Sequence, residues 1–153
     1  MKKTKALRLS TRILILLAII ILGVSLYNLF TFLSSAISSE TFGLNLSKNE
    51  STGDWLLSFS ANPRNNGFLD VSLFLEITVL DPNDRIVATD SKYVYIKAGG
   101  SQSFSITLTI PAEFFPGGDL QNAKGYFQMK MSIRTLGDLI GLTQIMKIGS
   151  GGT

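Results

Sequence analysis

Two different periods of hydrophobic positions divide the chain. From Ile13 to Leu33 the sequence is an apolar run of 21 residues without a charged side chain, and from Phe42 onward apolar and polar residues alternate. As a helix the run is about 31 Å long, which matches the roughly 30 Å hydrocarbon core of a bilayer, so it predicts a transmembrane helix. The alternation predicts β-strands with one buried face.

Seven or eight short strands are predicted after the apolar run, each bounded by turn residues. The longest alternates from Leu69 to Val79 and follows the strongest turn signal in the chain, Asn62 to Gly67. The other strands are expected near residues 42–46, 55–61, 85–89, 93–97, 103–110, 126–134 and 142–148. Because almost no helical period occurs among them, the pattern predicts an immunoglobulin-like Greek-key β-sandwich.

The predicted organisation has five parts. Residues 1–12 form a basic segment, 13–33 the transmembrane helix, 34–41 a short polar stalk, 42–148 the sandwich and 149–153 a flexible tail. The pattern leaves open whether the sandwich begins at Phe42 or only at Trp55. About 110 residues suffice for one domain with its own core and are too few for two.

The distribution of charge predicts the orientation of the helix. Five of the 14 Lys and Arg residues lie in the first 12 positions, where there is no acid, and the remaining 9 basic and 11 acidic residues give 9 − 11 = −2. Basic flanks stay on the cytoplasmic side, so we expect the N-terminus in the cytoplasm and the C-terminal domain outside. The net charge of +3 therefore reflects the first segment, and no nucleic-acid partner is expected.

Two other interpretations of the apolar run stay open. A cleaved signal peptide shares the basic start, and Ser34 to Ala36 is a suitable cleavage site, although signal cores usually span about 7 to 15 residues. A pilin-like helix would leave the bilayer and pack in a filament core, but no processing signal is evident in Leu9 to Arg12. An uncut anchor is favoured, with Tyr27 in the aromatic belt and Asn28 approaching the headgroups.

The sequence offers little for catalysis. It contains no Cys and no His, so it lacks thiols, the commonest general base and the commonest transition-metal ligand. Asp70 and Glu76 share a strand face but would lie about 20 Å apart, too far for joint acid–base work. The acids of the Asp81 to Asp84 turn lack the glycine and glutamate of a calcium loop. We therefore expect no enzyme, no cofactor, no metal and no small-molecule substrate.

Surface features are more informative. Asn45 and Asn49 lie in two sequons for N-linked glycosylation, both outside the membrane on this topology. Apolar residues on polar strand faces or in loops are candidates for an interface, or else cover the second sheet or touch the membrane. These aromatic candidates are Phe74, Tyr93, Tyr95, Phe114 and Phe115. The apolar segment from Leu136 to Leu142 either packs against the end of the sandwich or reaches the headgroups.

The segment from Trp55 to Pro111 resembles the LEA14-like family, also called the water-stress and hypersensitive-response domain. The resemblance is carried by Asn62-Pro63 at the end of a hydrophobic strand, by FLDVSLFLEITVLDPNDRIVA, and by the turn Lys97 to Gly100 leading into SFSITLTIP. It implies a β-sandwich without known catalytic residues, and an archaeal source is expected.

Topology and resemblance together give the predicted function. We expect a single-pass membrane protein whose extracytoplasmic sandwich is a non-catalytic structural or binding module of a cell-envelope complex. Its expected partners are the lipid bilayer, through residues 13–33, and other envelope or membrane proteins. The alternative is a pilin-like subunit of an extracellular filament.

Overall fold

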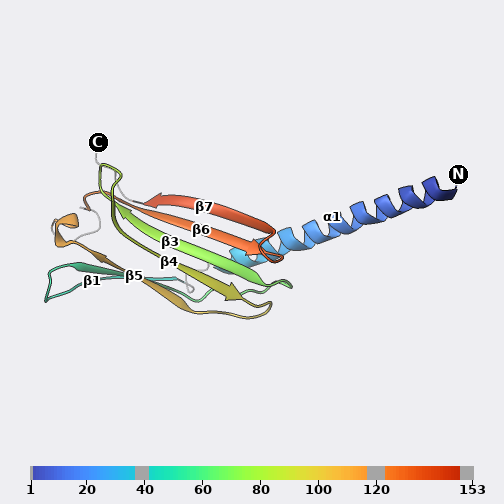
Figure 1. The fold of residues 1–153 in the computed structure, drawn as a ribbon. Helices are drawn as coiled ribbons and strands as arrows, with labels where there is room; N and C mark the ends of the chain where they lie inside the picture. Colours follow the sequence, from blue (N-terminus) through green and yellow to red (C-terminus); the bar gives the residue numbers. More distant parts are fainter. Residues whose placement is uncertain (1, 37–41, 117–122, 149–153) are drawn as a thin grey trace.

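A long helix and two antiparallel sheets make up the computed structural model, which describes residues 2–36, 42–116 and 123–148 (Figure 1). Helix α1 (Lys2–Ala36) projects from one end of the sheets. The three-stranded sheet has the order β1 (Phe42–Lys48), β2 (Trp55–Ala61), β5 (Phe104–Ile110). The four-stranded sheet has the order β4 (Ile86–Ile96), β3 (Val71–Leu80), β6 (Tyr126–Thr135), β7 (Ile140–Ile148). The predicted β-sandwich preceded by an apolar helix is confirmed.

The core forms because the alternating residues of both sheets face each other. On β5 every second residue is buried, from Phe104 to Ile110, while the intervening serines and threonines are exposed. Leu57 and Phe59 of β2 and most of β3 complete the core. Each fully buried aliphatic or aromatic side chain contributes about 1.5–3 kcal/mol to folding. Disulfides contribute nothing, since the sequence has no cysteine, and the domain is stabilised by packing and hydrogen bonds.

Strand β4 differs from the prediction of two short strands. It is continuous from Ile86 to Ile96 and pairs with β3 along its length, with one shift of register between Val79 and Leu80. The alternation breaks at Asp90 to Lys92, where consecutive side chains are exposed, but their main chains stay paired with Leu75 to Ile77. An edge strand can carry polar residues on both faces without losing its ladder to the inner strand. The alternation of apolar and polar residues reports which side chains are buried and not which main chains are paired, so it did not predict that β4 is continuous.

The C-terminal end of α1 belongs to the core of the sandwich. Phe32 is fully buried, with Leu29 and Leu33 packed beside it. The helix continues through Ser34 and Ser35 to Ala36, so these residues are helical where a stalk was predicted, and residues 37–41 of that stalk and the tail 149–153 lie outside the described part. Ser35 Oγ donates to the Arg64 carbonyl at 2.7 Å, which fastens this last turn to the β2–β3 loop.

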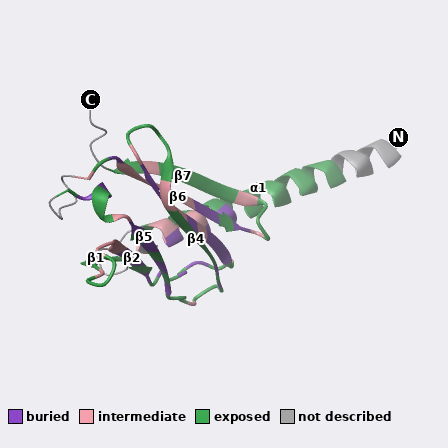
Figure 2. Cartoon of the chain, turned by 60° about the vertical axis from the view of Figure 1, so that its left-hand side comes forward, coloured by how far each residue is buried: buried purple, intermediate pink, exposed green. Residues whose placement is uncertain are grey.

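The N-terminal half of α1, as far as its side chains are described, is exposed. Every residue from Ser10 to Val24 is exposed, and buried positions begin at Ser25, a change visible along the helix in Figure 2. The helix from Ser10 to Ser35 is long and apolar enough to cross a membrane, with a mean hydropathy of 2.7.

Candidate functional site

Asn28 joins the helix to the sandwich. Its side chain is fully buried; Nδ2 donates to the Leu69 carbonyl at 3.1 Å, and the Leu69 N–H donates to Oδ1 at 2.9 Å. One amide thus exchanges two hydrogen bonds with one main-chain residue, as a neighbouring strand would. The β2–β3 loop thus satisfies a donor and the acceptor of the Asn28 side chain, and the approach of this residue to the headgroups stays a prediction.

A second buried amide shapes that loop. Asn65 Nδ2 donates to the carbonyls of Leu69 at 2.8 Å and Ile96 at 3.3 Å, and its Oδ1 accepts the Gly67 N–H at 3.0 Å. A Cβ on Gly67 would lie 1.8 Å from Asn28 Oδ1, so the close contact between helix and loop requires glycine there. Sequence reasoning missed this junction; the available signal was an asparagine inside an apolar run.

Three of the five aromatic candidates come together on the outer face of the four-stranded sheet. Phe74 on β3 pairs with Tyr93 on β4, and Tyr95 lies one step along the same face. Tyr93 and Tyr95 are 58% and 53% exposed, whereas Phe74 is half-buried. The Tyr93 hydroxyl donates to Ser72 Oγ at 2.8 Å, which fixes the direction of the ring. We call Phe74, Tyr93 and Tyr95 the aromatic face.

A cavity of about 430 Å³ lies beside Phe74 and Tyr93. Its lining includes two cations of β6, Lys130 and Arg134, and one anion, Asp138. Tyrosine and arginine are enriched at protein interfaces, since both combine apolar area with hydrogen-bond donors. This surface combines aromatic rings with charges of both signs, and its lining offers no base paired with a nucleophile.

Tyr95 and Asp70 form a hydrogen-bonded pair at the edge of the aromatic face. The Tyr95 hydroxyl and the Ala98 N–H both donate to the Asp70 carboxylate, the latter at 2.8 Å. These donors favour the ionised carboxylate, so the pKa of Asp70 is lowered from 3.8, chiefly by Tyr95. The same bond holds the phenol proton, so the pKa of Tyr95 is raised from 10.0. The pair therefore fixes the turn after β4 at neutral pH.

The other two aromatic candidates are core residues. Phe114 and Phe115 are 4% and 2% exposed, and both rings pack against Phe127, with centroids 6.1 and 6.3 Å away. Trp55 meets Phe115 edge to face at 5.7 Å. Their burial contradicts an exposed interface at this pair and agrees with the alternative that these side chains cover the second sheet. The pair lies at the end of the 3-10 helix η1 (Ala112–Phe114). Neighbouring side chains in a helical turn do not alternate between two faces as they do in a strand, so both rings can enter the core.

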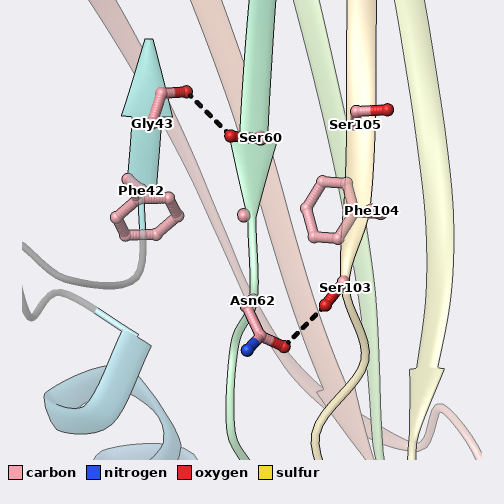
Figure 3. A pocket seen from close by; sticks show the side chains of 8 residues that line it. Phe42, Gly43, Ser60, Asn62, Ser103, Phe104 and Ser105 are labelled. Carbon is pink, nitrogen blue, oxygen red and sulfur yellow. Dashed lines mark hydrogen bonds between the residues drawn. The ribbon is translucent and has the colours of Figure 1, made fainter.

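The outer face of the three-stranded sheet is rich in serine and threonine. An open depression of about 620 Å³ lies here. Figure 3 shows residues that line it: Ser103 Oγ donates to Asn62 Oδ1, at 3.0 Å, and Ser60 Oγ approaches the Gly43 carbonyl. None of its lining residues is an acid or a base. Of the two sequon asparagines, Asn45 is exposed on β1, whereas Asn49 Oδ1 accepts the Ser51 N–H at 3.0 Å; glycosylation of both stays a prediction.

Apolar cavities open between the two sheets on the side of β1 and β7. They measure about 280 and 340 Å³ and share Phe42, Phe59 and Met129 in their linings. Their walls offer almost no polar group to orient a ligand. Within residues 2–36, 42–116 and 123–148, no three side chains of the metal-binding types lie together.

Comparison with known proteins adds little about function. No family model and no curated protein matches the sequence, so the resemblance to the LEA14-like family stays a prediction. Among solved structures, a β-glucuronidase from Bacteroides uniformis superposes with a TM-score of 0.49 at 15% identity over 71% of this chain. A glycoside hydrolase family 2 member from Bacteroides cellulosilyticus gives 0.46 at 15% identity over 73%.

The chain corresponds to only 13% and 15% of those enzymes. A likeness this distant assigns neither an activity nor a ligand to it. The fold and its surfaces define the protein as a β-sandwich that packs against and hydrogen-bonds to an apolar N-terminal helix, with an aromatic outer face.

Proposed function

We propose that this protein is a single-pass membrane protein whose extracytoplasmic sandwich acts as a non-catalytic binding module of a cell-envelope complex. The observation that carries the proposal is the course of α1. Its apolar side chains from Ile13 to Val24 are exposed, yet the same helix ends inside the sandwich core. So large an exposed apolar surface is unfavourable in water and marks a membrane or protein contact.

The charges of the chain support the proposed orientation. Five basic residues and no acid precede Ile13, whereas the remainder carries a net charge of −2. Lys and Arg next to a membrane span are retained on the cytoplasmic side. The sandwich, attached to the other end of α1, then stands outside the cell.

The absence of native cysteine allows a direct test of this topology. A Ser51→Cys variant places one thiol in the exposed β1–β2 turn, and a Thr4→Cys variant places one before the apolar run. In intact cells a membrane-impermeant maleimide should label the first variant, and should label the second only after permeabilisation. The opposite pattern contradicts the orientation, and labelling of both in intact cells contradicts the membrane span.

The aromatic face is the proposed binding surface. It joins exposed tyrosines to two cations around a concave site, the composition that protein interfaces favour. A photoreactive phenylalanine analogue at Tyr93 should form an adduct with an envelope protein in native membranes. The same analogue at Thr107, exposed on the outer face of the other sheet, is the matched control. Equal adducts at both positions would contradict a role for this face.

The filament subunit is the second candidate, and one observation favours it. The exposed stretch from Ile13 to Val24 has 12 residues, about 18 Å as a helix and shorter than a bilayer core. Such a stretch could also pack among copies of itself. Intact mass separates the two: the anchor requires the full chain in the membrane, whereas the filament requires loss of the basic segment before Ile13 and recovery as homopolymeric fibres.

A further inference from the structure

Three turns of the sandwich surround α1 where it enters. The β2–β3 loop (62–70) binds Asn28 through Leu69. Asp70 of this loop accepts the Ala98 N–H of the β4–β5 turn (97–103) at 2.8 Å, and the Asp70 carbonyl accepts Thr135 Oγ1 at 2.9 Å, just before the β6–β7 turn (136–139). Figure 1 shows the ends of these strands grouped at the helix.

The tips of two of these turns carry the most exposed large apolar side chains of the described residues. Leu139 is 84% exposed and Phe68 is 75% exposed. Phe68 stacks on Tyr27 of α1, with ring centroids 6.2 Å apart and planes 20° apart. Tyr27 is itself 55% exposed. An aromatic pair and a leucine therefore gather on the end of the sandwich that faces along the helix toward its N-terminus.

The length of the helix determines how near this end comes to the bilayer. The apolar run that precedes Tyr27, here called the free run, extends from Ile13 to Leu26, 14 residues, which is about 21 Å as a helix. The hydrocarbon core is about 30 Å thick, so the free run is about 9 Å too short. The seven residues from Tyr27 to Leu33, about 10 Å of helix, supply the difference, but Phe68 lies beside Tyr27. The turns must then meet the lipid.

We propose that Tyr27, Phe68 and Leu139 form a collar that inserts into the outer membrane–water boundary, so that the sandwich stands directly on the lipid. The inference rests on the proposed membrane anchoring. Amphipathic surfaces bury their apolar side chains about 5–10 Å into this boundary, which matches the shortfall. Tyrosine and phenylalanine beside a span suit the same depth.

Apolar insertion, and not headgroup charge, drives the contact. The same three turns carry two basic and two acidic side chains, namely Arg64, Lys97, Asp70 and Asp138. Their charges cancel, so anionic lipid should not change the depth of the collar. The junction through Asn28 holds the sandwich upright, so the opposite end of the domain, where Ile86 pairs with Leu80, points away from the lipid.

Tryptophan fluorescence in vesicles tests the collar. The full chain is reconstituted into phosphatidylcholine vesicles whose acyl chains carry bromine near the headgroup end. In a Trp55→Phe background, which removes the native tryptophan, single Phe68→Trp and Leu139→Trp variants report on the collar. Ile86→Trp is the matched control, because Ile86 is 65% exposed but pairs with Leu80 at the far end of the sandwich. Circular dichroism verifies that each variant folds.

The proposal expects both collar variants to lose most of their emission and to shift to the blue, with or without phosphatidylglycerol, while the control variant changes little. Emission from Phe68→Trp or Leu139→Trp that matches the control overturns the collar. Equal quenching of all three also overturns it, because the domain then lies on its side. Resistance to alkaline carbonate extraction is measured on the same vesicles: an extracted chain refutes the anchoring itself, whereas a resistant chain with unquenched collar variants refutes only the collar.

Discussion

An Asn28→Ala substitution tests whether helix and sandwich form one folding unit. The buried amide exchanges two hydrogen bonds with Leu69, whose carbonyl keeps the Asn65 amide as a donor at 2.8 Å. The substitution therefore deprives one partly buried main-chain N–H, that of Leu69, of its partner and removes one further hydrogen bond. Together these losses amount to about 2 to 4 kcal/mol of stability.

Gly67 provides the complementary change. A Cβ at this position would lie 1.8 Å from Asn28 Oδ1 and 2.5 Å from its Cγ, so Gly67→Ala must displace the amide and break the same hydrogen bonds. In the Asn28→Ala background those atoms are absent, and the second substitution should cost little. The two penalties should then fail to add by about 2 kcal/mol or more, the signature of residues in contact.

Thermal unfolding of the full chain in detergent, followed by Trp55 fluorescence, measures both effects. At about 4 °C per kcal/mol, the Asn28→Ala variant should melt about 8 to 16 °C lower. Asn66→Ala is the matched control in the same loop, since Asn66 is exposed, and it should change stability by less than about 0.5 kcal/mol. An unchanged melting temperature for Asn28→Ala, or strictly additive penalties with Gly67→Ala, would refute the rigid junction.

Two further predictions concern the sandwich. Because the pKa of Asp70 is lowered in the folded protein, its carboxylate contributes stability above pH 3.8 that is lost as the pH falls through the lowered value. In urea unfolding at pH 7, Asp70→Asn should therefore be less stable than the native chain, and the difference in free energy of unfolding should close in acid. A difference that persists in acid contradicts the hydrogen-bonded carboxylate. Phe115→Ala should lower the free energy of unfolding by about 3–5 kcal/mol, because the Phe115 ring is buried against Phe127. Phe74 is half-buried, so Phe74→Ala should lower it less and should instead weaken the photoadduct at Tyr93. Equal melting temperatures for the two variants would contradict this difference in burial.

The local pattern anticipated much of the sandwich and part of its binding surface. The alternation on β3 and β4 placed Phe74, Tyr93 and Tyr95 on polar faces, and the register of these strands brings them together. The pattern did not predict the burial of Phe114 and Phe115, because they lie at a helical turn, where alternation no longer indicates which side chains face the core. It also gave no indication that Lys130 and Arg134 of β6 line the adjacent cavity, because β6 pairs with β3 across a long sequence separation.

The sequence by itself determined the two kinds of element and the charge asymmetry. The period of apolar residues is a local property, fixed by the geometry of a helix or a strand, and it needs no partner. Only the tertiary structure decided where the helix ends and the sandwich begins. Asn28 reads as one polar residue in an apolar run until Leu69, 41 positions away, supplies a main-chain partner for both of its polar atoms. A buried amide is stable only when such partners are in place, and chain folding alone brings them there.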